Sequence, residues 1–366
     1  MKKIIKRIAF SLGIFLAGLL LFGWFIGCCT FSGPKYKGPV SDHFDGKEFF
    51  NQGNVKMNRS WNMLKWLANR EPGEWPLWIK SNYGPKPPEA VGTGELRITF
   101  INHSTVLIQM DSINILTDPV WSYRISPVDF AGPTRKRNPG IRFEYLPKIH
   151  YVLVSHNHYD HMDIPTLIKL KEKYDPDFIV SLGNKALMVE NGITKTFEMD
   201  WWDEIMIGQN TKLTFVPAQH FSMRGMCDKN TTLWGGFVIE SEGGPVYFAG
   251  DTGFGKIFEQ LFNKFGPMRF SMLPIGAFMP EDFMAPVHLS PAEAVNAHLV
   301  LKSKQSMGIH WGTFRQADDG LKAPLDALKK ALVKSGLTSK DFGIFEHGKG
   351  YIIPALKGEN TADISN

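Results

Sequence analysis

The stretch Ser155-His156-Asn157-His158-Tyr159-Asp160-His161 places three imidazoles and one carboxylate within six residues. It follows a short apolar, strand-like run and precedes a helical pattern. His156 and His158 are two residues apart, so an extended chain points both side chains to one side. Asp160 and His161 follow at once, in a loop or in the first turn of the helix. Imidazole and carboxylate ligands suit zinc, and also iron or manganese. The stretch therefore predicts a metal site at the end of a strand.

Three further candidate ligands each follow another apolar run of the chain. They are His220, Asp251 and His310. A sheet built from these runs can place all three at the same edge. A single buried His or Asp is more often a structural residue than a ligand. Together with the first four side chains, however, the set numbers seven, which is enough for two metal ions that share one carboxylate.

The composition excludes several classes of protein. The chain has 366 residues, of which 43% are hydrophobic and 21% charged, an ordinary globular balance that excludes a disordered chain and a coiled coil. Lys and Arg number 41 and Asp and Glu number 36, so the formal net charge is +5. This small, evenly spread charge does not indicate a nucleic-acid partner. Three cysteines exclude a dense disulfide framework. Cys28 and Cys29 are adjacent, and Cys227, alone in the body of the chain, has no partner for a disulfide within it.

Apolar runs and helical patterns are interspersed from Glu95 onward. The runs expected to form strands are Leu96–Ile101, Thr105–Met110, Asn114–Thr117, Tyr151–Val154, Phe178–Ser181, Leu213–Val216, Gly236–Ile239, Val246–Ala249, Ser271–Ile275, Ser306–Ile309 and Tyr351–Ile353. The expected helices are Ile164–Lys173, Phe254–Lys264, Ser290–Leu301 and Pro324–Ser335. Ser290 as the cap with Glu293 three residues later is typical of a helix start. Strands with interspersed helices predict an α/β domain, which we place at residues 95–356, followed by a polar tail at 357–366.

Residues 1–29 have the pattern of a membrane anchor or a signal. Four basic residues within positions 1–7 precede Ile8–Gly27, which carries no charge. As a helix this run spans roughly 30 Å, about one hydrocarbon core. Because positive flanks stay cytoplasmic, we expect the rest of the chain on the extracytoplasmic (periplasmic) side of a bacterial cell membrane. Two versions remain open. One is an uncleaved transmembrane helix. The other is a lipoprotein signal, in which Phe25-Ile26-Gly27-Cys28 resembles a lipobox and Cys28 is lipidated after cleavage.

Residues 30–94 are expected to form a linker followed by a Trp-rich extension. Phe31–Gly46 is rich in Gly, Pro and Lys, as linkers are. A helix-like apolar cluster follows, made of Trp61, Met63, Leu64, Trp66 and Leu67. Trp75-Pro76-Leu77-Trp78 comes next. The segment either packs on the main domain, or forms an interfacial aromatic patch or part of a lipid-binding groove.

The order of the candidate ligands resembles that of the metallo-β-lactamase superfamily. His156-x-His158-x-Asp160-His161 comes first, His220, Asp251 and His310 follow in that order, and the resemblance covers roughly residues 95–355. It implies an α/β (α+β) fold, the αββα sandwich, with two Zn²⁺ ions at one edge, Fe or Mn being alternatives. It also implies that one ion is held by His156, His158 and His220. The other would be held by Asp160, His161 and His310, with Asp251 bridging the two.

Other positions indicate a branch of this superfamily. Zinc β-lactamases usually carry Arg or Cys where this chain has His161 and Asp251. Diiron members typically carry Glu at the place of His158, and a flavin domain. The chain is instead similar to the N-acyl-phosphatidylethanolamine-hydrolysing phospholipase D group, although Asn102 stands where Gly is usual. The segments that carry this similarity are Trp75–Trp78, Phe100–Ile108, Leu116–Ser122, Ser126–Pro133, Asp200–Trp202 and Pro217–Ser222.

The second resemblance implies a zinc-dependent phosphoric diester hydrolase of the phospholipase D type. Metal-bound hydroxide would attack the phosphorus of N-acyl-phosphatidylethanolamine or a related membrane phospholipid, releasing phosphatidic acid and an N-acylethanolamine. Asp160, Asp251 and His288 are the catalytic candidates, and Asp160 is also a candidate for steering a proton to the leaving alkoxide. Tyr159 and His288 are the substrate-binding candidates. The alternative for both is a hydrogen bond to a metal ligand.

Several other expectations concern the surroundings of the site. Arg135, Lys136 and Arg137 form a basic loop, which is either a solvated turn or attracted to anionic lipid. His103 and Asp118 are expected to be structural or to hydrogen-bond to ligands. The resemblance also implies a homodimer.

Two alternative functions remain open at this stage. The first is a lactonase or sugar-phosphate hydrolase of the same fold, acting on a soluble substrate. A long apolar channel beside the metals favours a lipid, whereas a shallow polar site favours the soluble substrate. The second is a non-catalytic envelope protein that uses the metals for folding.

Overall fold

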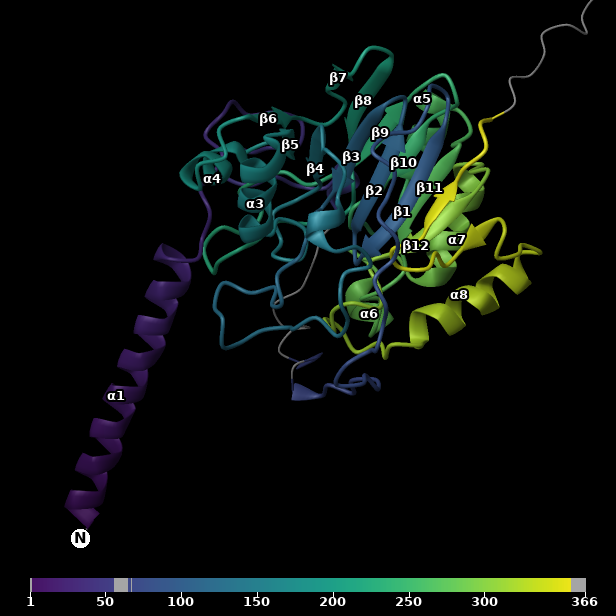
Figure 1. Cartoon of the computed structure of the whole chain (residues 1–366). Coiled ribbons are helices and arrows are strands. Elements are labelled where there is room, and N and C mark those ends of the chain that lie inside the picture. Colours follow the sequence, from purple (N-terminus) through teal and green to yellow (C-terminus); the bar gives the residue numbers. More distant parts are fainter. Residues whose placement is uncertain (1, 56–64, 67, 357–366) are drawn as a thin grey trace, which may run out of the picture.

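The computed structural model describes residues 2–55, 65, 66 and 68–356. Two seven-stranded sheets face each other, and helices cover their outer faces (Figure 1). The αββα sandwich implied by the sequence is therefore confirmed. Helix α1 (Lys2–Cys29) projects from this body as a separate rod (Figure 1).

The first sheet has the strand order β14-β1-β2-β3-β4-β5-β6. Its strands are β1 (Leu96–Asn102), β2 (Thr105–Met110), β3 (Ile113–Thr117), β4 (Tyr151–Val154), β5 (Asp177–Ser181), β6 (Thr196–Met199) and β14 (Gly350–Ile352). The pairs from β14 to β3 are antiparallel, and those from β3 to β6 are parallel. Helices α3 (Ile164–Tyr174) and α4 (Lys185–Glu190) cover the outer face, where Leu167, Leu170 and Met188 pack on strand residues.

The second sheet has the strand order β13-β12-β11-β10-β9-β8-β7. Its strands are β7 (Glu204–Ile207), β8 (Thr211–Val216), β9 (Gly236–Glu240), β10 (Val246–Phe248), β11 (Phe270–Pro274), β12 (Ser306–Ile309) and β13 (Phe342–Gly343). Its covering helices are α5 (Ile257–Phe265), α7 (Pro291–Val300) and α8 (Ala323–Lys334). The remaining short elements are α6 (Glu281–Met284) and the 3₁₀ turns η1 (Gln52–Asn54) and η2 (Phe143–Tyr145).

Strand direction brings several polar segments to one edge of the second sheet. Strands β8 and β10 both pair antiparallel with β9, so they run in the same direction. Strand β12 shares that direction because β10, β11 and β12 pair parallel. The carboxyl ends of β8, β10 and β12 therefore meet at one edge, as parallel strands require.

Aromatic side chains fill the space between the two sheets. Phe100 from the first sheet and Phe215, Phe237 and Phe248 from the second are fully buried in one continuous core. Burying such a side chain stabilises the fold by about 1.5–3 kcal/mol. This core holds the two sheets together and fixes the edge at which the polar segments end.

The structure contains each predicted strand and helix, with small shifts of their ends. Helix α7 begins with the predicted capping box of Ser290 and Glu293, whereas α5 begins at Ile257 rather than at Phe254. The sequence patterns do not predict α4, α6, β6, β7, β13 or the two 3₁₀ turns η1 and η2. Strand β7 is an edge strand with mostly exposed side chains, and β13 has two residues. Such segments carry too little apolar pattern to be recognised.

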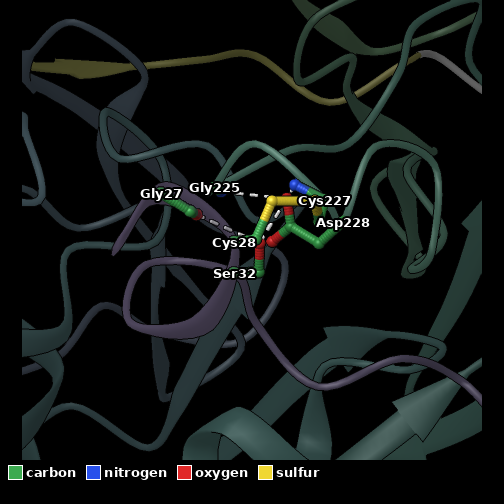
Figure 2. The surroundings of a disulfide bond; sticks show 6 residues. All are labelled: Gly27, Cys28, Ser32, Gly225, Cys227 and Asp228. Atoms are coloured by element: carbon green, nitrogen blue, oxygen red, sulfur yellow. Dashed lines mark hydrogen bonds between the residues drawn. A yellow bond between two sulfur atoms is a disulfide. The ribbon is translucent and has the colours of Figure 1, made fainter. Parts of the chain in front are cut away.

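A disulfide joins the end of α1 to the body of the protein. Figure 2 shows Cys28 paired with Cys227, 199 residues further along the chain. The cysteine that has no partner within the body is thus paired with the end of the apolar helix. Because one sulfur atom cannot form both a disulfide and a lipid thioether, this pairing favours the uncleaved helix over the lipoprotein alternative. Cys29 is free and exposed.

The length and composition of α1 fit a membrane anchor or a signal sequence. Residues Lys3–Cys29 form the single helix of the described chain that is long and apolar enough to cross a bilayer. Its side chains are exposed along almost the whole helix.

The extension before β1 packs on the sandwich where it is described. Phe44 and Phe49 are buried in the main core. Trp66 stacks on Phe283, with 5.4 Å between the ring centroids, and Trp75 Nε1 donates to a backbone carbonyl. These contacts favour packing over a free aromatic patch. The other residues of the predicted apolar cluster, and the predicted polar tail, lie outside the described residues. They are Trp61, Met63, Leu64, Leu67 and 357–366.

Candidate metal centre

The histidine-rich stretch forms a tight loop directly after β4. Ser155 starts the loop, and its N–H and Oγ both donate to Asp118, at 2.8 and 2.7 Å. The chain then turns back, and the N–H groups of His161 and Met162 donate to the carbonyl of His158, at 3.1 and 2.8 Å. This turn directs the side chains of the loop toward one point at the sheet edge.

The backbone around this loop adopts unusual conformations. His103, Asp118 and His310 all have positive φ angles, of 47°, 35° and 59°. Non-glycine residues rarely adopt such angles, and they concentrate at functional sites. Gly250, which precedes Asp251, also has positive φ, and a Cβ there would meet the Ser155 side chain at 2.7 Å. The close approach of these two loops therefore requires glycine at position 250.

The structure brings all seven predicted ligand side chains together. His156, His158 and His220 form one group, and the nearest ring nitrogens of His156 and His158 are 2.8 Å apart. A second group is formed by Asp160, His161 and His310, together with His103. Within each group the candidate ligand atoms lie within 4.8 Å of one another.

Asp251 lies between the two groups. Its Oδ2 is 3.2 Å from His161 Nε2 and 3.1 Å from His310 Nε2. The same oxygen is 3.7 Å from Nε2 of His220, which belongs to the other group. Asp251 Oδ2 thus lies within 3.7 Å of an imidazole nitrogen of each group.

The polar atoms of this cluster fit a metal site. His161 Nε2 and His310 Nε2 are buried and lie 3.1–3.4 Å from Asp160 and Asp251 Oδ2 without hydrogen-bond geometry, and Asp251 Oδ1 is buried with no hydrogen bond to the described residues. Buried polar atoms without a partner are costly. Imidazole nitrogens and carboxylate oxygens that point into a common space are the donors that divalent zinc prefers. A bound metal would satisfy them.

Further hydrogen bonds orient the candidate ligands from outside the cluster. Asp118 Oδ2 is 2.6 Å from His161 Nδ1, Ser155 Oγ is 2.9 Å from His156 Nδ1, and the Val287 carbonyl is 2.9 Å from His220 Nδ1. In each case the outer ring nitrogen is held, so the inner one faces the cluster. Such partners fix the ring orientation and raise the basicity of metal ligands.

The charges of the cluster shift its pKa values strongly. Burial alone would raise the pKa of Asp251, but His161 and His310 hold it well below the usual carboxyl value. Burial lowers the pKa of His156 and His220 well below that of a free imidazole, and the neighbouring histidines add to this effect. At neutral pH the carboxylate is therefore ionised and these two imidazoles are neutral, which are the forms that bind metals. Burial would lower the pKa of His161 and His310, but Asp251 raises it above that of a free imidazole, so a metal ion that binds these two rings would displace a proton from each.

A cavity of about 260 Å³ opens onto the cluster. Its polar end is formed by His158, Asp160, Asp251 and His310. Its other walls are largely apolar and include Ile125, Phe221, Met223 and Met284. The cavity is neither the long apolar channel expected for a lipid nor a shallow polar site. It joins a polar floor to an apolar rim.

The structure places Tyr159 and His288 in the wall of this cavity. His288 Nδ1 is 3.9 Å from Asp251 Oδ2, so its ring borders the cluster. Tyr159 lies under the guanidinium of Arg224, 3.9 Å from the ring centroid, and burial raises its pKa. Both side chains face the space that a substrate would enter. Their roles as substrate-binding residues stay predictions.

Two residues near the cluster are absent from the sequence predictions. Gln316 Nε2 donates to Asp160 Oδ2 at 2.6 Å, and His103 Nε2 lies 2.9 Å from the same oxygen. Asn51, from the extension, binds the backbone of His220 on both sides, through Nδ2 to the carbonyl at 2.9 Å and through Oδ1 from the N–H at 3.0 Å. No motif in the sequence marks Gln316 or Asn51, since each acts on a residue far away in the chain.

The basic loop differs from both of its predicted roles. Arg135 is buried, and its guanidinium donates to the carbonyls of Ser122 and Val120, at 2.9 and 3.1 Å. Arg137 is half-buried against the ring of His347. The two arginines are thus neither a solvated turn nor free to attract lipid, because backbone carbonyls and a ring already contact their charged groups.

Comparison with known proteins identifies the family of this fold. Residues 113–311 match the family described as the beta-lactamase superfamily domain. The chain belongs to the metallo-β-lactamase superfamily. It is a metal-dependent hydrolase by family, and the described His/Asp cluster is the candidate site for the metal.

Relatives within the superfamily include enzymes that act on a phospholipid. The chain is 37% identical over 227 residues to N-acyl-phosphatidylethanolamine-hydrolyzing phospholipase D 1 of Caenorhabditis elegans, covering 59% of this chain and 64% of that protein. It is 31% identical over 265 residues to the mitochondrial enzyme of that name from Saccharomyces cerevisiae, covering 69% of this chain and 54% of that protein. The chain thus spans less than two thirds of the length of these relatives.

Solved structures show the same fold at lower identity. A metallo hydrolase from the archaeon Ignicoccus hospitalis superposes with a TM-score of 0.53 at 19% identity, covering 72% of this chain and 100% of the other. At this identity the likeness concerns the fold alone. It agrees with the sandwich described above.

Proposed function

We propose that this superfamily member is a membrane-tethered phosphodiesterase with two metal ions. Its proposed substrate is N-acyl-phosphatidylethanolamine or a related phospholipid, cleaved in the phospholipase D manner. The observation that carries the proposal is the complete cluster of seven candidate ligands at one sheet edge. The names and similarity of the two relatives support the choice of substrate.

The proposed ligand assignment follows the two groups in the cluster. His156, His158 and His220 would hold one zinc ion. The second ion would be held by Asp160, His161 and His310. Asp251 would contact both ions. Two bound ions would lower the pKa of a shared water toward about 7 and polarise a phosphoryl oxygen.

The protein's own residues then bind and orient the diester. In this proposal the phosphate enters at the polar end of the cavity, next to His288 and Tyr159. His288 borders Asp251 and is placed to donate to a phosphate oxygen. His103 and Gln316 hold the Asp160 carboxylate in one orientation, where it can receive or pass on a proton of the leaving alkoxide.

The size of the cavity supports a lipid that is presented from a bilayer. A volume of about 260 Å³ admits a phosphodiester and its head group but not long acyl chains. The apolar rim, with Phe221, Met223 and Met284, suits chains that stay outside the cavity. A substrate that remains in the membrane fits this division better than a wholly soluble one.

The disulfide and the basic N-terminus support a tethered, extracytoplasmic protein. Disulfides persist in oxidising compartments and are rare in the cytosol, and Cys28 and Cys227 form one at the end of the apolar helix. The basic residues before α1 favour a cytoplasmic N-terminus. In this proposal the catalytic domain therefore lies on the periplasmic side. The homodimer implied by the family resemblance stays a prediction for sedimentation analysis.

The first test measures metal content and phosphatidic acid release with the full chain in detergent micelles. The parent should bind two zinc ions and release phosphatidic acid from N-acyl-phosphatidylethanolamine, whereas Asp251→Asn should not release it. Two bound ions without release of phosphatidic acid would exclude N-acyl-phosphatidylethanolamine as the substrate. Turnover of lactones or sugar phosphates would then establish the alternative soluble hydrolase. A loaded protein inactive on diesters, esters and lactones would be the non-catalytic alternative.

A further inference from the structure

The end of α1 is docked on one loop of the body. Besides the disulfide, the Met226 N–H donates to the Gly27 carbonyl at 3.0 Å. The Cys227 N–H donates to Ser32 Oγ at 3.1 Å (Figure 2). A Cβ on Gly27 would collide with the Met226 side chain, so the two segments touch directly. The helix end is therefore fixed to the body and not merely joined by a flexible linker.

A buried carboxylate extends this attachment. Asp228 accepts hydrogen bonds from the N–H groups of Gly33, Gly225 and Arg224, at 2.7, 2.9 and 3.1 Å. It thus binds the residues that follow α1 and, at the same time, closes the loop that carries Cys227. We call residues 221–232 the rim loop.

The rim loop also forms one wall of the metal site. It begins directly after His220, and Phe221 and Met223 line the cavity. The Met223 N–H donates to Asn157 Oδ1 at 3.0 Å, inside the histidine-rich loop. Arg224 donates to the Asn157 carbonyl at 2.8 Å. One loop therefore links the membrane helix to the opening of the cavity.

The exposed part of this region is apolar and basic. Met223 and Met226 are 39% and 62% exposed. Lys35 and Lys37, just after α1, are exposed as well. Asp228 is the sole acidic residue of segment 30–37 and the rim loop, and it is fully buried. Such a surface suits the interface of a bilayer, where apolar groups meet acyl chains and lysines meet lipid phosphates.

The direction of α1 places this surface toward the membrane. Figure 1 shows α1 extending toward the side of the body on which α6 lies, away from β7 at the opposite edge. Met284 of α6 lines the cavity. The end of the body that carries α6, and with it Met284 of the cavity wall, therefore lies on the side toward which α1 extends.

We propose that the Cys28–Cys227 disulfide clamps the rim loop onto the bilayer that holds α1, so that the opening of the metal site faces lipid. Met223 and Met226 are the lipid-contacting residues of this surface. The inference rests on the proposed membrane tether and specifies how the site reaches its substrate. Without the disulfide, hydrogen bonds of Gly27, Ser32 and Gly33 alone would hold the end of α1 on the rim loop, and the body could turn the opening away when they break.

Formation of the clamp has a defined chemistry. The two thiols lose two protons and two electrons, which a partner disulfide of an extracytoplasmic oxidoreductase accepts as it becomes a dithiol. The product excludes a lipid thioether on Cys28. Peptide mass mapping of the full chain without reductant should therefore find Cys28 joined to Cys227. A lipidated or free Cys28 would overturn the proposal.

The functional test compares two substrates in the full chain reconstituted in vesicles. The vesicles contain phosphatidylethanolamine, phosphatidylglycerol and N-acyl-phosphatidylethanolamine, and the soluble substrate is bis(p-nitrophenyl) phosphate. Cys28→Ser should lower phosphatidic acid release by about tenfold, because the opening of the metal site then spends less time at the vesicle surface and its effective concentration there falls. The same variant should leave turnover of the soluble diester unchanged. Cys29→Ser, one residue away, should change neither. Equal loss of both activities, or no loss on vesicles, would overturn the proposal.

A second measurement does not depend on turnover. Met226 on the rim loop and Met206 on β7 are the same residue type with the same exposure, 62%. A photoreactive benzoylphenylalanine at position 226 should form lipid adducts, and one at 206 should not. Cys28→Ser should remove the adducts at 226. Equal labelling at both positions would overturn the proposal, whereas absent phosphatidic acid release with selective labelling at 226 would reject only the lipid substrate.

Discussion

Replacing Asn51 with alanine tests whether the N-terminal extension positions a metal ligand. The Asn51 amide accepts from the His220 N–H at 3.0 Å and donates to the His220 carbonyl at 2.9 Å. It also accepts from Trp234 Nε1, which has a second acceptor in the Ala218 carbonyl. Asn51 and His220 are both buried, so water does not readily replace the amide.

The size of the effect follows from the two backbone groups that lose their partner. A buried N–H or C=O without a partner costs about 1–3 kcal/mol, so Asn51→Ala should cost about 2–6 kcal/mol of unfolding free energy. Trp234 Nε1 adds little, because it keeps one acceptor. The ring of His220 should also become less well oriented. Losing a partner that orients a ligand typically weakens metal affinity by about 10–100-fold.

The assay combines urea unfolding with zinc competition against a chromophoric chelator. Asn69→Ala is the matched control, because Asn69 is exposed and, among the described residues, its amide hydrogen-bonds the Lys65 carbonyl alone. This control should change the unfolding free energy by less than about 0.5 kcal/mol. If Asn51→Ala binds zinc and unfolds like the control, the extension does not position His220.

Three further changes address the rest of the site and the extension. Asp251→Asn removes the carboxylate between the two groups of candidate ligands, and we expect the zinc content to fall below two ions. Turnover should drop by more than about 100-fold, which exceeds the loss typical of a residue that only hydrogen-bonds to a metal ligand. His288→Ala should lower turnover while metal content stays nearly intact, and loss of metal would contradict its placement in the cavity wall. Burial would lower the pKa of His43, but Asp200 and Asp42 raise it above the value of a free imidazole. Its stabilising contribution is therefore full below about pH 6.5 and is lost as pH rises through the higher folded pKa. Urea unfolding at several pH values should show this dependence, and His43→Gln should lack it.

The ligand cluster could be predicted because it depends on local pattern and chain direction. Each of its segments follows an apolar run, and apolar runs in an α/β chain end at sheet edges. His156 and His158 share a side because they alternate along an extended chain. The order of the residues then matched one superfamily, and the fold is confirmed.

The contacts that support the cluster could not be predicted in this way. Asn51 and His220 are 169 residues apart, and Gln316 and Asp160 are 156 apart. A single polar side chain carries no periodicity, so its partner emerges only once the fold is known. Arg135 shows the converse case. Its charge indicated an exposed loop, yet the fold supplies two backbone carbonyls that allow it to be buried.

The extension joins these observations into one argument about the folding unit. Three of its residues each bind a different part of the body: Gly33 the Asp228 carboxylate of the rim loop, His43 the Asp200 carboxylate and Asn51 the His220 backbone. Phe44 and Phe49 are buried as well, and two such side chains contribute about 3–6 kcal/mol, a large fraction of the about 5–15 kcal/mol that stabilises a domain. Residue 95 therefore marks where the sheets begin, whereas the unit that holds the metal site begins with the segment that leaves α1. The proposed attachment to the membrane and the construction of the site thus depend on one stretch of chain, so we expect a change in that stretch to affect both.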